Sequence, residues 1–302
     1  MKLFSVGTVV ALGSVVVVTA LFLAKNKSVG PAKLLAYTVE EATDANSKVI
    51  VKVEYDVAYG DLPKQKLDLC RPQNIGGKVP AVMLVHGGGG DKKDFTSICK
   101  SLAQNGLVAA AVNYREDPPP TYKVVLGDNR AALAWLKAKS YVEPNKIGYW
   151  GGSQGGYVSS VAGTDERPDK VQCVNNNYGA TDFTDPSEWE GSALPDEVAE
   201  RFFGGVTYEE DPELYRDLSP VIQVSANDAK KWLLTRSTND QLVPRTQMTK
   251  MMDALQAAGL QAEFYEYEGK GSGHANQLGP AQAKKLLQKR MNFMTGCLKG
   301  IL

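Results

Sequence analysis

The chain has 302 residues, of which 43% are hydrophobic, and it carries 34 basic and 34 acidic residues. This length and composition suffice for one sizeable hydrophobic core. The net charge is zero and charges of both signs are interspersed. Because proteins that bind nucleic acid present a concentrated basic surface, this balance argues against a nucleic-acid partner.

The first segment of the chain is uncharged from Leu3 to Ala24. As a helix it is long enough to span a bilayer, and it is longer than the apolar core of most signal peptides. We expect residues 1–27 to be a membrane anchor or an export signal, and residues 28–48 to be a linker. The lysines that flank the segment and its signal-like start favour opposite orientations, so the side of the membrane stays open.

Strand-like and helix-like runs then alternate along residues 49–302, which we expect to form one α/β domain. Eight runs have strand character: 49–55, 65–69, 81–85, 107–112, 146–150, 171–175, 231–235 and 262–267. Four longer runs have helical patterns: 95–104, 122–139, 245–258 and 281–298. The first two strands are close in sequence and suggest an antiparallel pair, whereas helices separate the later ones. This order predicts a mostly parallel eight-stranded sheet flanked by helices.

Residues 181–230 interrupt the alternation of strands and helices. The segment is long, partly helical from Leu194 to Phe203, and rich in aromatic residues. We interpret it as a small helical cap inserted into the domain. Most of its aromatic side chains are expected to form the cap's own core, and one or two of them to line a substrate pocket.

A candidate nucleophile follows the strand at 146–150, where the sequence reads Gly151-Gly152-Ser153-Gln154-Gly155. A serine on a sharp strand-to-helix turn needs small residues two positions away on both sides, and both of these positions hold glycine. The alternative is a glycine-rich turn without chemistry. The rest of the chain argues against this alternative, because it supplies partners for the serine.

The chain contains two histidines, His86 and His274. His274 lies in a loop after the last predicted strand, at the end of the sheet where open α/β sheets carry their sites. We expect it to be the general base for Ser153. Asp240 follows the strand at 231–235 and is expected to orient His274, although it could also serve only as a helix cap. The rival Asp228 precedes that strand and therefore belongs at the opposite end of the sheet.

Glycines follow His86 directly, as His86-Gly87-Gly88-Gly89-Gly90, after the apolar run at 81–85. Bare backbone N–H groups in such a loop can bind the oxyanion of an acyl-transfer intermediate. We expect the oxyanion hole to comprise the N–H groups of Gly87, Gly88 and Gln154, with His86 shaping the loop. A phosphate-binding loop is excluded by the absence of the Gly-Lys-Ser/Thr ending.

The four cysteines, Cys70, Cys99, Cys173 and Cys297, are widely spaced. No Cys-x-x-Cys pair is present, and both histidines have other assignments, so no metal site is expected. Their redox state stays open between buried thiols and, in an exported domain, disulfides.

The four motifs together resemble the α/β-hydrolase family in its esterase/lipase branch, over about residues 49–298. The run Asn113-Tyr114-Arg115, with prolines shortly after it, resembles an element of hormone-sensitive-lipase-like esterases. Arg115 and Asp128 are expected either to pair behind the glycine loop or to be separate exposed charges. The chain departs from the family pattern at Asn113, at Arg236-Ser237 and at Ala275. These departures leave the sub-branch and the substrate open.

The resemblance implies a serine esterase that cleaves carboxylic esters through an acyl-serine intermediate and needs no cofactor. Its catalytic residues would be Ser153, Asp240 and His274. The substrate would be a small-molecule or polysaccharide ester, and short acyl chains are favoured. Two alternatives remain: a serine peptidase of the prolyl-oligopeptidase type, and a binding module on the same fold.

Overall fold

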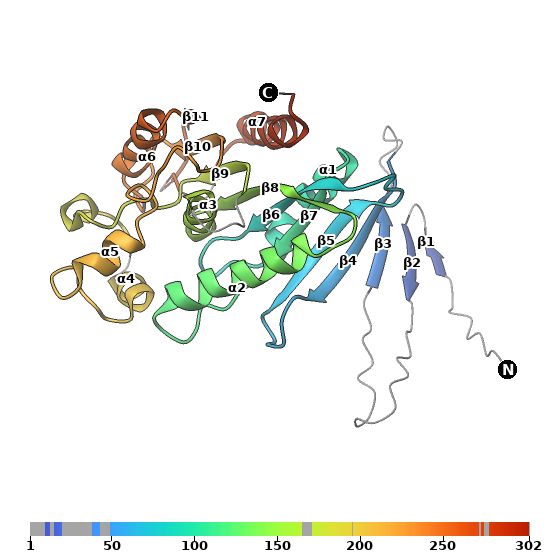
Figure 1. The fold of residues 1–302 in the computed structure, drawn as a ribbon, viewed down its shortest axis with the longest axis horizontal. Helices are drawn as coiled ribbons and strands as arrows, with labels where there is room; N and C mark the ends of the chain where they lie inside the picture. Colours follow the sequence, from blue (N-terminus) through green and yellow to red (C-terminus); the bar gives the residue numbers. More distant parts are fainter. Residues whose placement is uncertain are drawn as a thin grey trace, which may run out of the picture.

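The computed structural model describes residues 10–12, 15–19, 38–42, 49–164, 171–194, 196–271, 273–274 and 278–301. At its centre is one sheet with the strand order β1-β2-β3-β4-β5-β7-β6-β8-β9-β10-β11 (Figure 1). The eight predicted strands are present as β4 (Val51–Ala58), β5 (Lys66–Pro72), β6 (Val79–Val85), β7 (Val108–Val112), β8 (Val142–Gly152), β9 (Cys173–Asn177), β10 (Lys231–Ser237) and β11 (Gln261–Tyr267). The predicted pairing is confirmed, because β4 and β5 are antiparallel and the strands from β7 to β11 run parallel.

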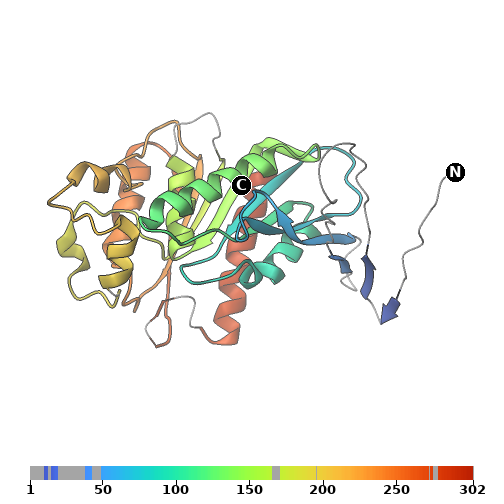
Figure 2. The same ribbon diagram turned by 90° about the horizontal axis from the view of Figure 1, so that it is seen from below.

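Helices cover both faces of the sheet, as the alternating sequence pattern predicts. One face is covered by α1 (Thr96–Gln104) and α7 (Pro280–Lys299), and the other by α2 (Thr121–Lys137), α3 (Gln154–Thr164) and α6 (Arg245–Ala257). In Figure 2 the red helix α7 and the green helix α2 lie on opposite faces of the sheet. A central strand is therefore apolar on both faces: in β6, Met83 packs into one core and Leu84 into the other, and both side chains are fully buried.

The N-terminal segment differs from expectation where the structure describes it. Within residues 3–24 the described positions form strands β1 (Val10–Leu12) and β2 (Val15–Thr19), not the expected helix. Strand β3 (Thr38–Ala42) lies in the expected linker, and the three strands extend the sheet antiparallel from β4. Valine occupies positions 15–18, and β-branched side chains favour strands over helices. The remainder of residues 1–48, apart from these strands, lies outside the described residues.

None of the helices in the described part of the chain is long and apolar enough to cross a membrane.

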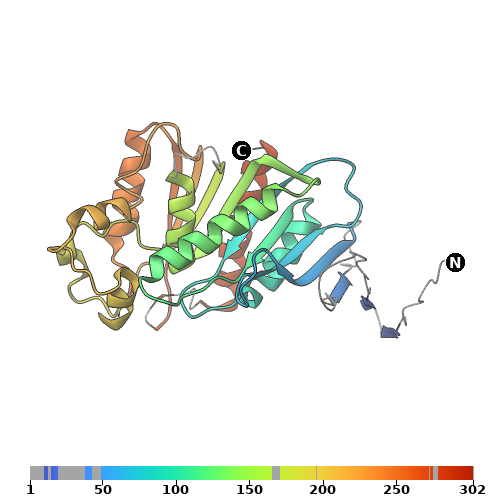
Figure 3. The ribbon, with the colours of Figure 1, turned by 60° about the horizontal axis from the view of Figure 1, so that its bottom comes forward.

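Between β9 and β10, where the sequence predicts a cap, the chain forms three short helices. They are the 3-10 helix η2 (Pro186–Trp189), α4 (Asp196–Phe203) and α5 (Pro212–Asp217). Figures 1 and 3 show α4 and α5 at the end of the molecule opposite β1–β3. Phe203 stacks on Tyr215 with ring centroids 4.0 Å apart, and Phe202 lies edge-on to Tyr157 of α3 at 5.4 Å. The cap aromatics therefore share their core with the helix that follows Ser153.

All four cysteines form disulfides, which settles the alternative left open by the sequence. Cys70 of β5 is bonded to Cys99 of α1, and Cys173 of β9 is bonded to Cys297 of α7. Both bonds lie on the same face of the sheet and tie a helix to a strand beneath it.

Candidate active site

The parallel strands bring the candidate residues to one edge of the sheet. β6, β8, β9, β10 and β11 all point the same way, so the loops after their carboxyl ends gather at that edge. These loops carry the glycines after His86, Ser153, Asp240 and His274. The parallel topology therefore brings the loops that carry the predicted site residues to the same edge of the sheet.

Ser153 lies on a turn between β8 and α3, and its backbone has a φ of 54°. This is the left-handed region, where a residue with a side chain is held at a cost of about 1–3 kcal/mol. The turn is kept in place by a hydrogen bond of 2.9 Å from the Ser153 N–H to the Asn177 carbonyl oxygen in β9. The serine is thus presented at a sharp, strained strand-to-helix turn, as the motif predicts.

The flanking glycines are required by close backbone contacts. A Cβ on Gly151 would lie 2.1 Å from the Gly155 carbonyl oxygen, and a Cβ on Gly155 would lie 2.0 Å from the Val85 carbonyl oxygen. Both distances are well below any van der Waals contact, and the clashing atoms belong to the backbone. The two small residues of the motif are therefore explained by the close packing of the turn on itself at Gly151 and against β6 at Gly155.

The three predicted catalytic residues are within hydrogen-bonding distance of one another. His274 Nε2 lies 3.0 Å from Ser153 Oγ, and His274 Nδ1 lies 2.9 Å from Asp240 Oδ2 and 3.1 Å from Oδ1. The Asp240 side chain is fully buried and its Oδ1 also accepts hydrogen bonds from the N–H groups of Leu242 and Val243. With Nδ1 protonated toward Asp240, Nε2 is free to take the serine proton.

The histidine loop is fitted closely to the aspartate loop. Gly273 has a φ of 72°, and a Cβ at this position would lie 2.5 Å from the Asn239 carbonyl oxygen. The Asn239 side chain in turn donates a hydrogen bond of 3.2 Å to the Gly271 carbonyl oxygen. Only glycine fits immediately before His274, and this close packing fixes the backbone position from which the imidazole side chain extends.

Tyr178 is a site residue that the sequence analysis did not identify. It follows β9, has a φ of 46°, and its ring meets the His274 ring edge-on with centroids 4.9 Å apart. Its hydroxyl lies 2.7 Å from where a Cβ on Gly152 would be. Tyr178 therefore packs between the serine turn and the imidazole. No sequence motif marks it, because its role comes from the end of a neighbouring strand.

The glycine loop after β6 lies beside the serine. A Cβ on Gly87 would be 3.2 Å from Ser153 Cβ, and the loop turns back through a hydrogen bond of 3.0 Å from the Gly90 N–H to the Gly87 carbonyl oxygen. Gln154 is the first residue of α3, where backbone N–H groups favour negative charge. Within the described residues, no protein acceptor takes a hydrogen bond from the N–H of Gly88 or Gln154.

The glycine loop is supported by side chains from the segment after β7. The Tyr114 ring stacks on His86 with centroids 4.2 Å apart, and its hydroxyl donates to the His86 carbonyl oxygen at 2.7 Å. His86 Nδ1 lies 2.7 Å from the Gly87 carbonyl oxygen. Burial lowers the pKa of His86 below its ordinary value. His86 is therefore a loop-shaping residue, as expected, and not a second base beside Ser153.

Arg115 and Asp128 form the ion pair that the sequence left undecided. The guanidinium donates to both carboxylate oxygens, at 2.7 and 2.9 Å, and Gln65 adds a third hydrogen bond at 2.7 Å. Burial alone raises the pKa of Asp128, but the hydrogen bonds from Arg115 and Gln65 outweigh it and lower the pKa below its ordinary value. The pair anchors the segment that carries Tyr114.

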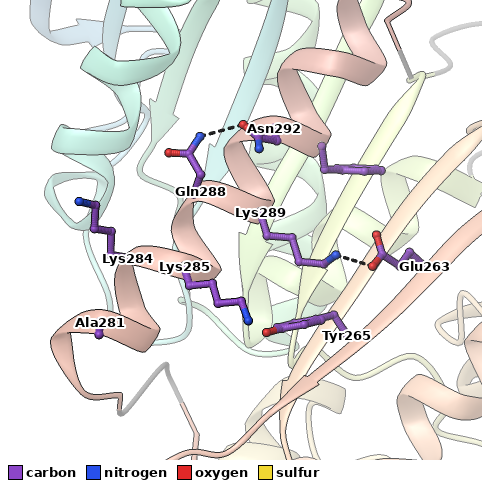
Figure 4. A pocket seen from close by; sticks show the side chains of 9 residues that line it. Glu263, Tyr265, Ala281, Lys284, Lys285, Gln288, Lys289 and Asn292 are labelled. Atoms are coloured by element: carbon purple, nitrogen blue, oxygen red, sulfur yellow. Dashed lines mark hydrogen bonds and ion pairs between the residues drawn. The ribbon is translucent and has the colours of Figure 1, made fainter.

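Two other features lie away from this site. Asp228, the rival acid, accepts hydrogen bonds from the backbone and hydroxyl of Ser225, and so caps a turn before β10. A pocket of about 670 Å³ lies between β11 and α7 and contains none of the predicted catalytic residues (Figure 4). Its lining includes the exposed lysines Lys284 and Lys285, and Lys289, which pairs with Glu263. We assign this open groove no part in the chemistry.

The sheet topology and the strained serine turn define an α/β-hydrolase fold. The chain belongs to the BD-FAE family, whose model matches residues 67–255.

Two curated relatives come from Mycobacterium tuberculosis strain H37Rv. "Probable carboxylic ester hydrolase LipM" is 29% identical over 79% of this chain and 58% of its own length. "Esterase LipC" is 30% identical over 72% of this chain and 59% of its own length. The chain therefore spans about three fifths of the length of these relatives.

Among solved structures, the one titled "Bacterial Heroin Esterase" superposes with a TM-score of 0.68 at 21% identity, covering 82% of this chain and 84% of that one. At that level of identity the likeness establishes the fold. It leaves the choice of substrate to the chemistry of the site.

Proposed function

We propose that the chain is a carboxylic-ester hydrolase that works through an acyl-serine intermediate. The observation that carries the proposal is the continuous hydrogen-bonded series Ser153, His274, Asp240, with contacts of 3.0 Å at the serine and 2.9 Å at the aspartate. The names of the two curated relatives as esterases support it. The serine turn alone is compatible with a binding module, but that role gives no reason to hold a buried aspartate against the imidazole.

In this mechanism His274 takes the Ser153 proton as the serine oxygen attacks the acyl carbon. The N–H groups of Gly87, Gly88 and Gln154 stabilise the oxyanion, and loss of one such donor is typically worth about 10²–10³ in turnover. His274 then protonates the leaving alcohol. Water, deprotonated by the same imidazole, releases the acyl group from Ser153. We propose short acyl chains on a small-molecule or polysaccharide alcohol, because the cap aromatics are packed against one another and against Tyr157 of α3.

The test is pre-steady-state hydrolysis of p-nitrophenyl esters of increasing acyl length by the full chain, beside Ser153→Ala. We expect a burst of nitrophenol with short esters, and a loss in the variant of several orders of magnitude, about 10⁶ where a comparable serine has been removed. A peptide p-nitroanilide tests the peptidase alternative, which predicts faster cleavage of the amide than of the ester. No labelling of Ser153 by a fluorophosphonate, with the protein folded, would support the binding module.

We further propose that residues 1–27 direct the chain to a membrane or export it. The uncharged stretch from Leu3 to Ala24 supports this, and so do the two disulfides, because such bonds persist in oxidising compartments. The test is cell fractionation combined with thiol alkylation before reduction. We expect to find the chain in the membrane fraction or the exported fraction, with none of its cysteines labelled. A soluble intracellular chain with labelled cysteines would contradict the proposal.

A further inference from the structure

A carboxylate lies directly on the glycine loop of the site. Glu116 accepts hydrogen bonds from the Gly89 N–H at 3.1 Å through Oε1 and at 3.2 Å through Oε2. Its side chain is half-buried. Among the described residues, no basic side chain forms an ion pair with this carboxylate. A negative charge is thus held against the loop without a described cation to neutralise it.

The glycine loop shows where Glu116 lies relative to the residues assigned to the oxyanion hole. Its Oε1 lies 3.6 Å from where a Cβ on Gly88 would be, and Gln154 Oε1 lies 3.5 Å from the same point. Gly88 and Gln154 are two of the three residues assigned to the oxyanion hole. The carboxylate therefore lies beside two residues of the proposed oxyanion hole, within reach of a group that flanks the ester bond of a bound substrate.

The surrounding charges add to that of Glu116. The neighbouring Asp117 pairs with Arg201 of α4, and the Arg115 guanidinium is engaged by Asp128.

On the other side of the loop, the negative charges of Asp91 and Asp94 act on His86 in the same direction as the charge of Glu116. Lys92 points away from the loop, toward Asp68 and Asp56. Lys93 is an exposed cation beside the loop, and it acts on Asp91. Glu116, Asp91 and Asp94 outnumber this one lysine, so we infer a negative potential at the loop.

We propose that Glu116 is a specificity-determining residue that selects esters with a positively charged group next to the ester bond and disfavours negatively charged ones. The proposal rests on the proposed esterase function. Opposite charges attract strongly within a few ångströms in a site that is partly shielded from water, and like charges repel by as much. The same carboxylate opposes the developing oxyanion of any substrate. A cationic substrate compensates for this opposition, whereas a neutral one does not.

The test compares three thioacetates with the full chain: acetylthiocholine, its neutral isostere with a tert-butyl group in place of the trimethylammonium, and an anionic S-acetyl mercaptoalkanoate. Released thiol is measured, and kcat/KM is compared between substrates. We expect the cationic ester to exceed the neutral isostere by about tenfold, and the anionic ester to be slowest, as for one close charge pair. In Glu116→Gln the cationic-to-neutral ratio should fall close to unity.

Two control variants separate charge from position. Glu116→Asp keeps the charge and should keep most of the ratio, whereas Asp253→Asn removes an exposed charge on α6 and should leave it within about twofold, as expected for a screened surface charge. In the wild-type chain the ratio should also fall with added salt, which gives a readout even if Glu116→Gln does not fold. A ratio that is unchanged in folded Glu116→Gln overturns the inference. Failure of all three thioesters, with the wild type no faster than Ser153→Ala, overturns the proposed function instead.

Discussion

The two sides of the site are held in place by different means. On the serine side, backbone touches backbone: Gly151 and Gly155 allow the chain to pass within distances that no Cβ can occupy. On the oxyanion side, the glycine loop is supported by the ring and hydroxyl of Tyr114 and by the carboxylate of Glu116. A substitution on the serine side, which is held by steric contact, should therefore abolish activity. A substitution of a supporting side chain on the oxyanion side should lower activity only in part.

The largest effect is expected from Gly155→Ala on the serine side. The new methyl group would lie 2.0 Å from the Val85 carbonyl oxygen, and neither backbone segment can move without displacing β6 or α3. We expect no measurable esterase activity, and a cost in the free energy of unfolding at or above the 1–3 kcal/mol usual for overpacking. Circular dichroism and ester hydrolysis measure both. Gly76→Ala, where no atom lies within 4 Å of the added Cβ, is the matched control.

Asp240→Asn should give the next largest effect. The amide oxygen would accept the hydrogen bonds from the N–H groups of Leu242 and Val243, and its NH2 group would donate to the imidazole, so His274 would populate the tautomer with Nδ1 unprotonated. By analogy with other triads we expect kcat to fall by about 10⁴ with the fold intact. A melting temperature close to that of the wild type must accompany this loss. A decrease of less than tenfold would mean that Asp240 is only the cap of the turn at Leu242 and Val243.

Tyr114→Phe tests the side-chain support of the glycine loop. It keeps the ring that stacks on His86 and removes the hydroxyl that donates to the His86 carbonyl oxygen. A small displacement of the loop should lower kcat by on the order of tenfold to a hundredfold, with a smaller change in KM. Steady-state kinetics on a short p-nitrophenyl ester provide the measurement. Complete inactivation would remove the distinction between the two sides of the site.

The smallest effect concerns pH and His86. Because burial lowers the pKa of His86 in the folded state, the unfolded chain binds a proton that the folded chain does not as the pH falls below about 6.5. This contribution to stability is therefore present above about pH 6.5 and is lost toward lower pH. In His86→Phe, urea unfolding between about pH 7.5 and pH 5.5 should show a shallower loss of stability. Parallel curves for the two proteins would rule out this role.

Much of the fold and the assembly of the candidate site could be predicted from the sequence. The central strands are buried on both faces and read as short apolar runs, and each functional loop follows one of them. Strand β9 was predicted two residues early, because Asn175, Asn176 and Asn177 do not look like strand residues. Asn177 fits there only because its side chain donates to the Gly151 carbonyl oxygen and accepts from Thr235. Such partners come from tertiary structure.

The same reason explains what the sequence did not reveal. Tyr178 follows a predicted strand and Glu116 follows the run Asn113-Tyr114-Arg115, but neither belongs to a motif, and their importance depends on which loops lie beside them. The pairing of the cysteines joins residues 29 and 124 positions apart, which local patterns do not address. The uncharged segment from Leu3 to Ala24 predicts a helix because its length fits a membrane span. The valines at positions 15–18 instead favour the strand β2 that the structure describes.

The disulfide between Cys173 and Cys297 has a further consequence for the covalent architecture. The ring that it closes contains the whole cap, Asp240 and His274, while Ser153 lies outside it. A protease that cut the cap once would leave both pieces joined, with the acid and the base still tethered to the strand beside the nucleophile. Reduction after such a cut would leave the base and the nucleophile held together by non-covalent contacts alone. The Cys173–Cys297 bond therefore keeps the catalytic residues covalently joined independently of the peptide backbone of the cap.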